Sequence, residues 1–164
     1  MVKPLVSIVM GSSNDWEIMQ QSARALQDFG VTFDARVISA HRSPDLLFSY
    51  IKEMSEQGVQ FFIAGAGGAA HLAGVIAGKT TLPVLGVPIP SKYLKGMDSL
   101  LSIVQMPKGI PVATFAIGEA GAANAGLFAV SILALNDKQL AQKLTEYRKK
   151  QAEQIAATTL PTLN

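Results

Sequence analysis

The sequence predicts one α/β domain built on a parallel sheet, and two observations support this class. Short apolar runs alternate along the chain with longer segments of helical length, separated by brief turns rich in Gly, Ser and Pro. This alternation is typical of βαβ units with right-handed crossovers. A length of 164 residues suits one domain with a substantial core. We expect the domain to span residues 1–157, followed by a tail at residues 158–164.

Five runs have the length and composition of buried strands. Each is short and apolar, and glycine or proline residues flank most of them. In chain order the predicted strands are Leu5–Met10, Phe33–Ile38, Val59–Ala64, Leu82–Val87 and Pro111–Ile117.

The predicted helices lie between and after these strands. Polar residues at 12–15 offer N-caps for a helix that ends near residue 29, before Gly30. Pro44 suits the first position of a helix that ends near residue 57, before Gly58. The remaining helices are a small-residue helix that follows a glycine-rich loop and ends at Gly78, and the segments Asp98–Gln105, Glu119–Leu135 and Asp137–Ala157.

Composition restricts the classes of partner. Only 16% of the residues are charged, against about 25% in a typical soluble domain, so we expect other subunits to cover part of the surface. The net charge of +2 comes entirely from the polar segment after residue 136, which is more typical of a solvated helix than of a nucleic-acid site. No segment has the apolar density of a membrane span, so no membrane partner is expected. The chain has no cysteine, which fits a reducing cytoplasm.

Four polar or glycine-rich turns follow predicted strands, and they therefore share the carboxyl edge of the sheet. In such sheets ligands bind beyond this edge, where the strand order reverses. One site built from all four turns is the simplest interpretation. The turns are Gly11–Asp15, Ser39–Arg42, Gly65–His71 and Pro88–Pro90.

The two histidines, His41 and His71, are the main candidates for proton transfer near neutral pH. His41 stands beside Arg42, which with Ser39 and Ser43 can bind a phosphate. The alternative is a solvated turn before a proline-started helix, and we favour the functional interpretation. His71 by itself is more typical of a structural histidine.

The other turns are less specific. The residues from Ser12 to Asp15 suit a phosphate and sugar hydroxyls at a helix N-terminus, but they equally suit simple helix capping, which this motif alone favours. The Gly65–Leu72 segment lets main chain approach a planar ligand closely. Its spacing matches neither a dinucleotide fingerprint nor a P-loop, and no metal-ligand spacing is present.

These motifs together resemble the class I 5-(carboxyamino)imidazole ribonucleotide mutases, the catalytic-subunit type of phosphoribosylaminoimidazole carboxylase. The resemblance runs from about Val6 to Leu135. It rests on four segments in order: Gly11-Ser12-x-x-Asp15-Trp16, Ser39-Ala40-His41-Arg42-x-Pro44, Ala64–Leu72 and Asp98–Pro107.

The resemblance implies a flavodoxin-like three-layer αβα sandwich, with a central five-stranded parallel sheet and an extended C-terminal helix. It implies a homo-octamer with sites between subunits, no metal and no organic cofactor. The implied reaction belongs to purine biosynthesis and moves a carboxylate from the exocyclic nitrogen of aminoimidazole ribonucleotide to ring carbon 4. It proceeds by decarboxylation and recarboxylation. A transient contact with the ATP-dependent synthetase that makes the substrate is also expected.

The resemblance also implies residue roles. His41 matches the histidine that shuttles the proton. Ser12, Ser39 and Arg42 match phosphate ligands, and Asp15 matches the ribose ligand. The loop that encloses the base and carbon dioxide corresponds to Gly67, Gly68, Ala70, His71 and Leu72.

Two residues depart from the family pattern, and two other functions stay open. Asn14 replaces a serine and Ala73 replaces a proline. Because neither change touches His41 or Arg42, we expect activity to remain. The alternatives are direct carboxylation of aminoimidazole ribonucleotide by carbon dioxide and a catalytically silent nucleotide- or flavin-binding module. Arg42, where relatives that carboxylate directly typically carry lysine, speaks against the first alternative.

Overall fold

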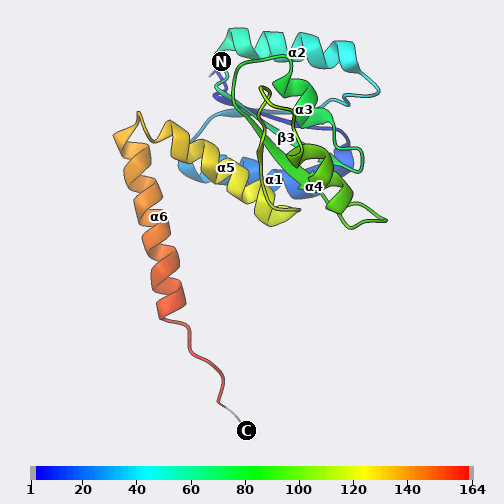
Figure 1. The fold of residues 1–164 in the computed structure, drawn as a ribbon. Coiled ribbons are helices and arrows are strands. Elements are labelled where there is room, and N and C mark those ends of the chain that lie inside the picture. The colour runs from blue at the N-terminus through cyan, green and yellow to red at the C-terminus, as the bar shows by residue number, and fades with distance from the viewer. Residues whose placement is uncertain (1–2, 163–164) are drawn as a thin grey trace.

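A five-stranded parallel sheet lies between two layers of helices in the computed structural model, which describes residues 3–162 (Figure 1). The strand order is β2-β1-β3-β4-β5, so the direction of strand addition reverses between β1 and β3. This is the flavodoxin-like order, and it confirms the predicted fold class. The strands are β1 (Val6–Met10), β2 (Phe33–Val37), β3 (Phe61–Gly67), β4 (Val84–Ile89) and β5 (Ala113–Thr114).

The helices divide between the two faces of the sheet. Figure 1 shows α2 and α3 above the sheet, and α1 and α5 below it. A short 3₁₀ turn, Ser13–Asp15, precedes α1. The helices are α1 (Trp16–Phe29), α2 (Pro44–Gln57), α3 (Leu72–Ala77), α4 (Met97–Val104), α5 (Glu119–Leu133) and α6 (Lys138–Ala156).

Helix α6 extends away from the sandwich, as expected for the C-terminal helix (Figure 1). Leu140 is its one buried residue among those described, and Leu144 and Tyr147 pack partly against the core. Beyond Tyr147 the helix is exposed along its whole length. Within residues 3–162, no helix combines the length and the apolar character that a membrane crossing requires.

The alternation of side chains along β1 creates two cores. Val6, Ile8 and Met10 pack among residues of α1 and α5, whereas Val9 packs among residues of α2 and α3. All five residues of β1 are buried, because helices cover both faces of a central parallel strand.

Small residues let α1 and α5 approach each other closely. A Cβ at Gly126 of α5 would lie 2.8 Å from the carbonyl oxygen of Ser22 in α1. The wholly buried hydroxyl of Ser22 donates a hydrogen bond to the carbonyl of Ala122, at 2.6 Å. This contact ties the two helices together.

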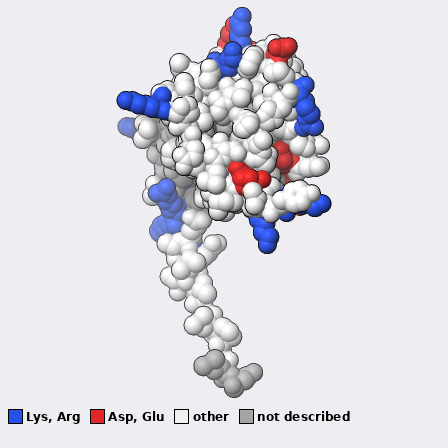
Figure 2. All heavy atoms as spheres, turned by 45° about the vertical axis from the view of Figure 1, so that its right-hand side comes forward, with Lys and Arg blue, Asp and Glu red and all other residues white. Residues whose placement is uncertain are grey.

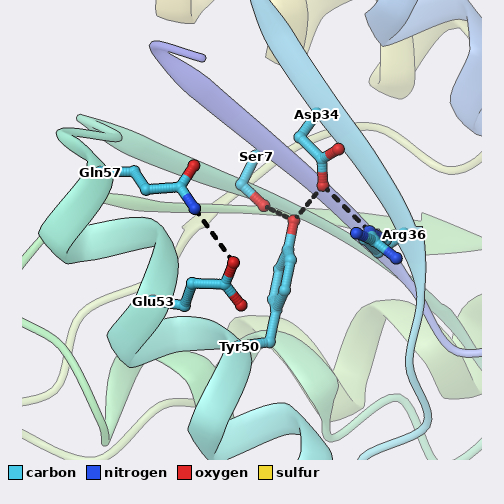
Figure 3. A network of polar contacts seen from close by, with 6 residues as sticks. All are labelled: Ser7, Asp34, Arg36, Tyr50, Glu53 and Gln57. Atoms are coloured by element: carbon cyan, nitrogen blue, oxygen red, sulfur yellow. Dashed lines mark hydrogen bonds and ion pairs between the residues drawn. The ribbon is translucent and has the colours of Figure 1, made fainter. Parts of the chain in front are cut away.

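A second buried polar contact joins β1, β2 and α2 (Figure 3). Tyr50 donates from its hydroxyl to Asp34 Oδ2 at 2.7 Å, and its oxygen lies 2.7 Å from Ser7 Oγ, which therefore acts as the donor. Arg36 Nε lies 3.4 Å from the same Asp34 oxygen. Burial, and with it the bond to Asp34, raises the pKa of Tyr50 well above its ordinary value, so the hydroxyl stays protonated and keeps its role as donor.

The predicted boundaries of three strands are wrong. The third strand continues to Gly67 and does not end at Ala64, because Gly65 and Gly67 pair with β4 instead of forming a loop. Gly65 fits there because Met19 occupies the space that a side chain would need. The fourth strand starts and ends two residues later than predicted, and only Ala113 and Thr114 of the fifth pair with β4.

The predicted limits of the domain and the tail are not tested. Residues 158–162 follow α6 without helix or strand and are exposed. Residues 1–2 and 163–164, which the predicted domain and tail also include, lie outside the described part of the chain.

Candidate active site

A cleft of about 460 Å³ opens at the carboxyl edge of the sheet, where β1 and β3 lie side by side. All four predicted turns contribute to it, because parallel strands deliver their carboxyl ends to one edge. The lining includes these predicted residues: Ser12, Asp15, Ser39, His41, Arg42, Gly67, Gly68 and Leu72.

The two histidines meet at this cleft. His41 Nε2 lies 2.9 Å from His71 Nδ1, and the two rings are nearly perpendicular, at 88°. A hydrogen bond between two imidazoles requires one proton between the nitrogens, so each ring restricts the tautomer of the other. Both side chains are exposed, and His41 lines the cleft. The pair is therefore accessible to a ligand and able to hold a proton there.

A main-chain carbonyl and a serine hydroxyl hold the Arg42 side chain across the cleft. Its Nη2 donates to the carbonyl of Gly11 at 2.9 Å, and its Nε donates to Ser39 Oγ at 3.3 Å. The backbone N–H of Arg42 also donates to Ser39 Oγ, at 3.2 Å. The other N–H groups of the guanidinium have no partner within residues 3–162. They remain available for an anion such as a phosphate.

The turn after β1 caps the 3₁₀ turn that leads into α1, which agrees with the capping interpretation of this motif. Asn14 donates its N–H to Ser12 Oγ at 3.3 Å, and Ser12 donates its own N–H to Asp15 Oδ2 at 3.0 Å. The hydroxyl proton of Ser12 is not used in this cap. Capping and ligand binding are therefore compatible at this turn.

Asp15 has a perturbed acidity. Burial raises the pKa of its carboxyl group, although the N–H groups of Ser12 and Gly11 and the charge of Arg42 act in the opposite direction. A half-buried carboxyl group in a cleft beside a cation is a frequent feature of functional sites. It is also an acceptor suited to sugar hydroxyls.

The segment after β3 forms a tight turn with little side-chain bulk. Gly68 has a φ of +67°, a conformation that glycine adopts without strain. Ala70 donates its N–H to the carbonyl of Gly68, and His71 donates its own to the carbonyl of Ala69, both at 2.8 Å. Ala70 itself does not line the cleft, since its side chain is buried in the core beneath α2 and α3.

One lining residue, Ser91, lies outside the predicted turns and the predicted site residues. Ile89 and Pro90 end the predicted Pro88–Pro90 turn, and Ser91 follows them. Ser91 donates to Asp98 Oδ1 at 2.5 Å, a bond that lowers the pKa of Asp98. The signal for Ser91 in the sequence was its position directly after the end of a predicted turn that follows a strand. Within residues 3–162, no group of three or more His, Cys, Asp or Glu side chains is arranged to hold a metal ion.

Comparisons with known proteins point to a single family. The family model described as AIR carboxylase matches residues 5–154. The N5-carboxyaminoimidazole ribonucleotide mutase of Bacillus subtilis is 57% identical over 148 residues, covering 90% of this chain and 91% of the relative. The enzyme of the same name from Saccharolobus solfataricus is 52% identical, with 96% and 98% covered. The crystal structure of Treponema denticola PurE superposes with a TM-score of 0.85 at 32% identity, covering 93% of this chain and 94% of that one.

Proposed function

The chain belongs to the AIR carboxylase family, and from this membership we propose that it is a mutase of purine biosynthesis. In this proposal it converts 5-(carboxyamino)imidazole ribonucleotide to 4-carboxy-5-aminoimidazole ribonucleotide. One observation carries the assignment to this cleft: an exposed histidine pair lies beside an arginine whose remaining donors suit a phosphate. The substrate carries both a phosphate and a ring that must exchange protons.

The reaction is balanced with a single acid/base group. The bond between the exocyclic nitrogen and the carboxylate carbon breaks and releases carbon dioxide within the site. The electrons of this bond stay on the nitrogen, which takes a proton from His41. Ring carbon 4 then attacks the trapped carbon dioxide and returns its own proton to His41. The net change is an isomerisation, and His41 regains its initial state. A histidine suits this cycle because its ordinary pKa lies close to neutral pH.

His71 supports this role through its hydrogen bond to His41. When His41 carries the extra proton, both of its nitrogens are donors, and neutral His71 accepts from Nε2. This bond orients the protonated ring. The Nδ1–H of His41 then stays available for a second partner.

The remaining residues bind and enclose the substrate. Arg42, Ser39 and Ser12 bind the phosphate, and Asp15 accepts hydrogen bonds from the ribose. Gly67, Gly68 and Leu72 form the wall against the base, with Ala70 and His71 completing that turn from behind. Such a wall matters because carbon dioxide released into water is lost to the reaction. The mechanism that we propose uses no metal and no organic cofactor.

The assembly that we propose is an octamer. Apart from Glu119, Asn124 and Ser131, helix α5 consists of apolar and small residues, a composition typical of a helix covered by other protein. Figure 2 shows a face formed mostly by uncharged residues, with Lys and Arg mainly around its outline. Large apolar side chains on and around α4 and on α5 are exposed: Tyr93, Leu94, Met97, Leu101, Val104 and Phe128. Light scattering should give a mass eight times the 17.4 kDa of the chain, and a monomer would contradict the proposal.

The cellular setting follows from the same proposal. A chain without cysteine fits the reducing cytoplasm, where purine synthesis takes place. Because the substrate is unstable, a transient contact with the ATP-dependent synthetase that makes it would shorten its time in solution.

The decisive test is an assay of the purified protein with 5-(carboxyamino)imidazole ribonucleotide, without ATP or added metal. Rapid formation of the carbon-4 carboxylate, with little product from aminoimidazole ribonucleotide at low bicarbonate, is expected. Efficient product formation from aminoimidazole ribonucleotide and bicarbonate would instead indicate direct carboxylation. No conversion by a folded oligomer, together with a bound yellow cofactor, would favour a flavin-binding module.

A further inference from the structure

Ser99, in the first turn of α4, is a buried hydroxyl group that contacts two walls of the cleft. Its side chain is fully buried, with 0% exposure. Its Oγ donates to the carbonyl of Ile89 at 2.7 Å and accepts the N–H of Gly68 at 2.9 Å. Gly68 and Ile89 both line the cleft and come from the ends of adjacent strands. One hydroxyl group therefore joins the glycine turn to the end of β4.

The contact is well suited to hold the turn in place. Gly68 has left-handed φ and no atom within 4 Å of where a Cβ would be, so side-chain packing does not restrain it. Hydrogen bonds restrain Gly68 instead. Its N–H donates to Ser99 Oγ, and its carbonyl accepts from Ala70 N at 2.8 Å and from Ser102 Oγ at 3.3 Å. Ser102 also donates to the Asp98 carbonyl at 2.7 Å, which makes its bond to Gly68 the weaker one.

The same turn of α4 also reaches the third side of the cleft. Asp98 Oδ1 accepts from Ser91 Oγ at 2.5 Å and from the N–H of Ser99 at 3.0 Å. Ser91 lines the cleft. Helix α4 thus holds the glycine turn, the end of β4 and the segment after it in one hydrogen-bonded arrangement, without itself lining the cleft.

We propose that Ser99 is a positioning residue that keeps the glycine turn closed over the cleft and so retains the carbon dioxide formed during turnover. This role rests on the proposed mutase function. Ser99 does not touch the substrate; it acts through Gly68 and Ile89. Its loss should open the turn and let carbon dioxide exchange with the solvent before carbon 4 captures it.

The test is turnover of unlabelled substrate in ¹³C-bicarbonate with carbonic anhydrase, scored as the fraction of product that carries ¹³C. The wild type should incorporate little label. Ser99→Ala should incorporate roughly fivefold more, the effect on the turn of losing the bond from Gly68 N–H, one hydrogen bond of ordinary strength. Ser22→Ala is the matched control, since Ser22 is equally buried and donates to the main-chain carbonyl of Ala122, and neither residue lines the cleft. Its label fraction should equal that of the wild type.

Two results would overturn the proposal: unchanged labelling in Ser99→Ala, or an equal rise in Ser22→Ala, which would indicate general loosening of the fold. If Ser99→Ala does not fold, Ser102→Ala should show the same change to a smaller degree, and wild-type labelling in that variant would count against the proposal.

Failure of the mutase function itself would look different, because the wild type would then give fully labelled product or none. In that case hydrogen exchange of a peptide spanning residues 66–71 decides the role of Ser99. Exchange roughly fivefold faster in Ser99→Ala than in Ser22→Ala supports it, and equal exchange rejects it.

Discussion

The Tyr50 network and the turn at Ser39–Arg42 contain similar polar groups but use them in opposite ways. In the network, Tyr50, Ser7 and Asp34 bond to one another, and Ser7 and Tyr50 are buried. At the turn, Arg42 is held by a main-chain carbonyl and one hydroxyl and is exposed. Polar side chains that hydrogen-bond to one another use their donors and acceptors to stabilise the fold. Side chains anchored by the backbone keep free atoms for a ligand.

This contrast predicts that changes at the cleft alter turnover with little effect on stability, and that changes in the network do the reverse. The largest expected effect is that of His41→Asn. Loss of a general acid/base group lowers turnover about 10²- to 10⁴-fold. Because His41 is exposed, the free energy of unfolding should change by less than about 0.5 kcal/mol.

Initial rates and thermal melts at one fixed protein concentration would measure both effects of His41→Asn. Turnover near that of the wild type would remove His41 from its role. Loss of binding to the product, measured by calorimetry, would show that the variant had damaged the site rather than the chemistry.

Arg42→Ala should weaken binding of the product about 10- to 100-fold, since a charge-assisted hydrogen bond contributes about 1.5–3 kcal/mol. Arg36→Ala is the matched control, because Arg36 is paired with Asp34 in the network and lies outside the cleft. Its affinity should be that of the wild type. Equal affinities of the two variants in calorimetry would contradict the phosphate role of Arg42.

Tyr50→Phe should lower the free energy of unfolding by about 1–3 kcal/mol, because the buried hydroxyl of Ser7 then loses its partner. Turnover at room temperature should not change. The double variant Ser7→Ala with Tyr50→Phe should be less destabilised than the sum of the single variants, since no unpaired Ser7 hydroxyl remains. Urea titrations would measure this, and strict additivity would argue against the network.

The smallest effect expected is that of Asp15→Asn on the pH dependence of stability. Burial raises the pKa of Asp15 in the folded state, so the folded chain binds this proton more tightly than the unfolded chain does. The contribution of Asp15 to stability is therefore present at low pH and is lost as pH rises through the raised pKa. In the Asp15→Asn variant, this decrease in stability with rising pH should be absent above pH 3.8, the ordinary pKa of the aspartate side chain. Melting temperatures that change with pH by the same slope in the wild type and in the variant across pH 4–7 would contradict this role of Asp15.

The element order and the location of the cleft were predictable, because both depend on local pattern. Apolar runs such as the one ending at Met10 mark strands, and turns that follow parallel strands must share one edge. The length of β3 was not predictable in this way. Gly65 and Gly67 have the composition of a loop, and their place in a strand depends on Met19 and Ile89, which come from other elements.

Contacts between residues that are distant in the sequence could not be predicted from local sequence pattern either. His41 and His71 are thirty residues apart, and only the packing of β1 between β2 and β3 brings their turns together. Ser99 is a serine within a short helix, a position where the residue type alone gives no functional signal. Its importance follows from the two strand ends that it bonds to.

The fit of Gly65 against Met19 imposes an order on evolutionary change. A Cβ at residue 65 would lie 2.3 Å from Met19 Sδ, and Met19 is fully buried. Alanine at residue 65 therefore requires the buried Met19 side chain to shift or residue 19 to become smaller, and a smaller residue 19 beside Gly65 leaves a cavity of its own. The two positions are epistatic, and the intermediate sequence is less stable than either end of the path. A lineage that begins from this pair is expected to retain both residues together or to replace both.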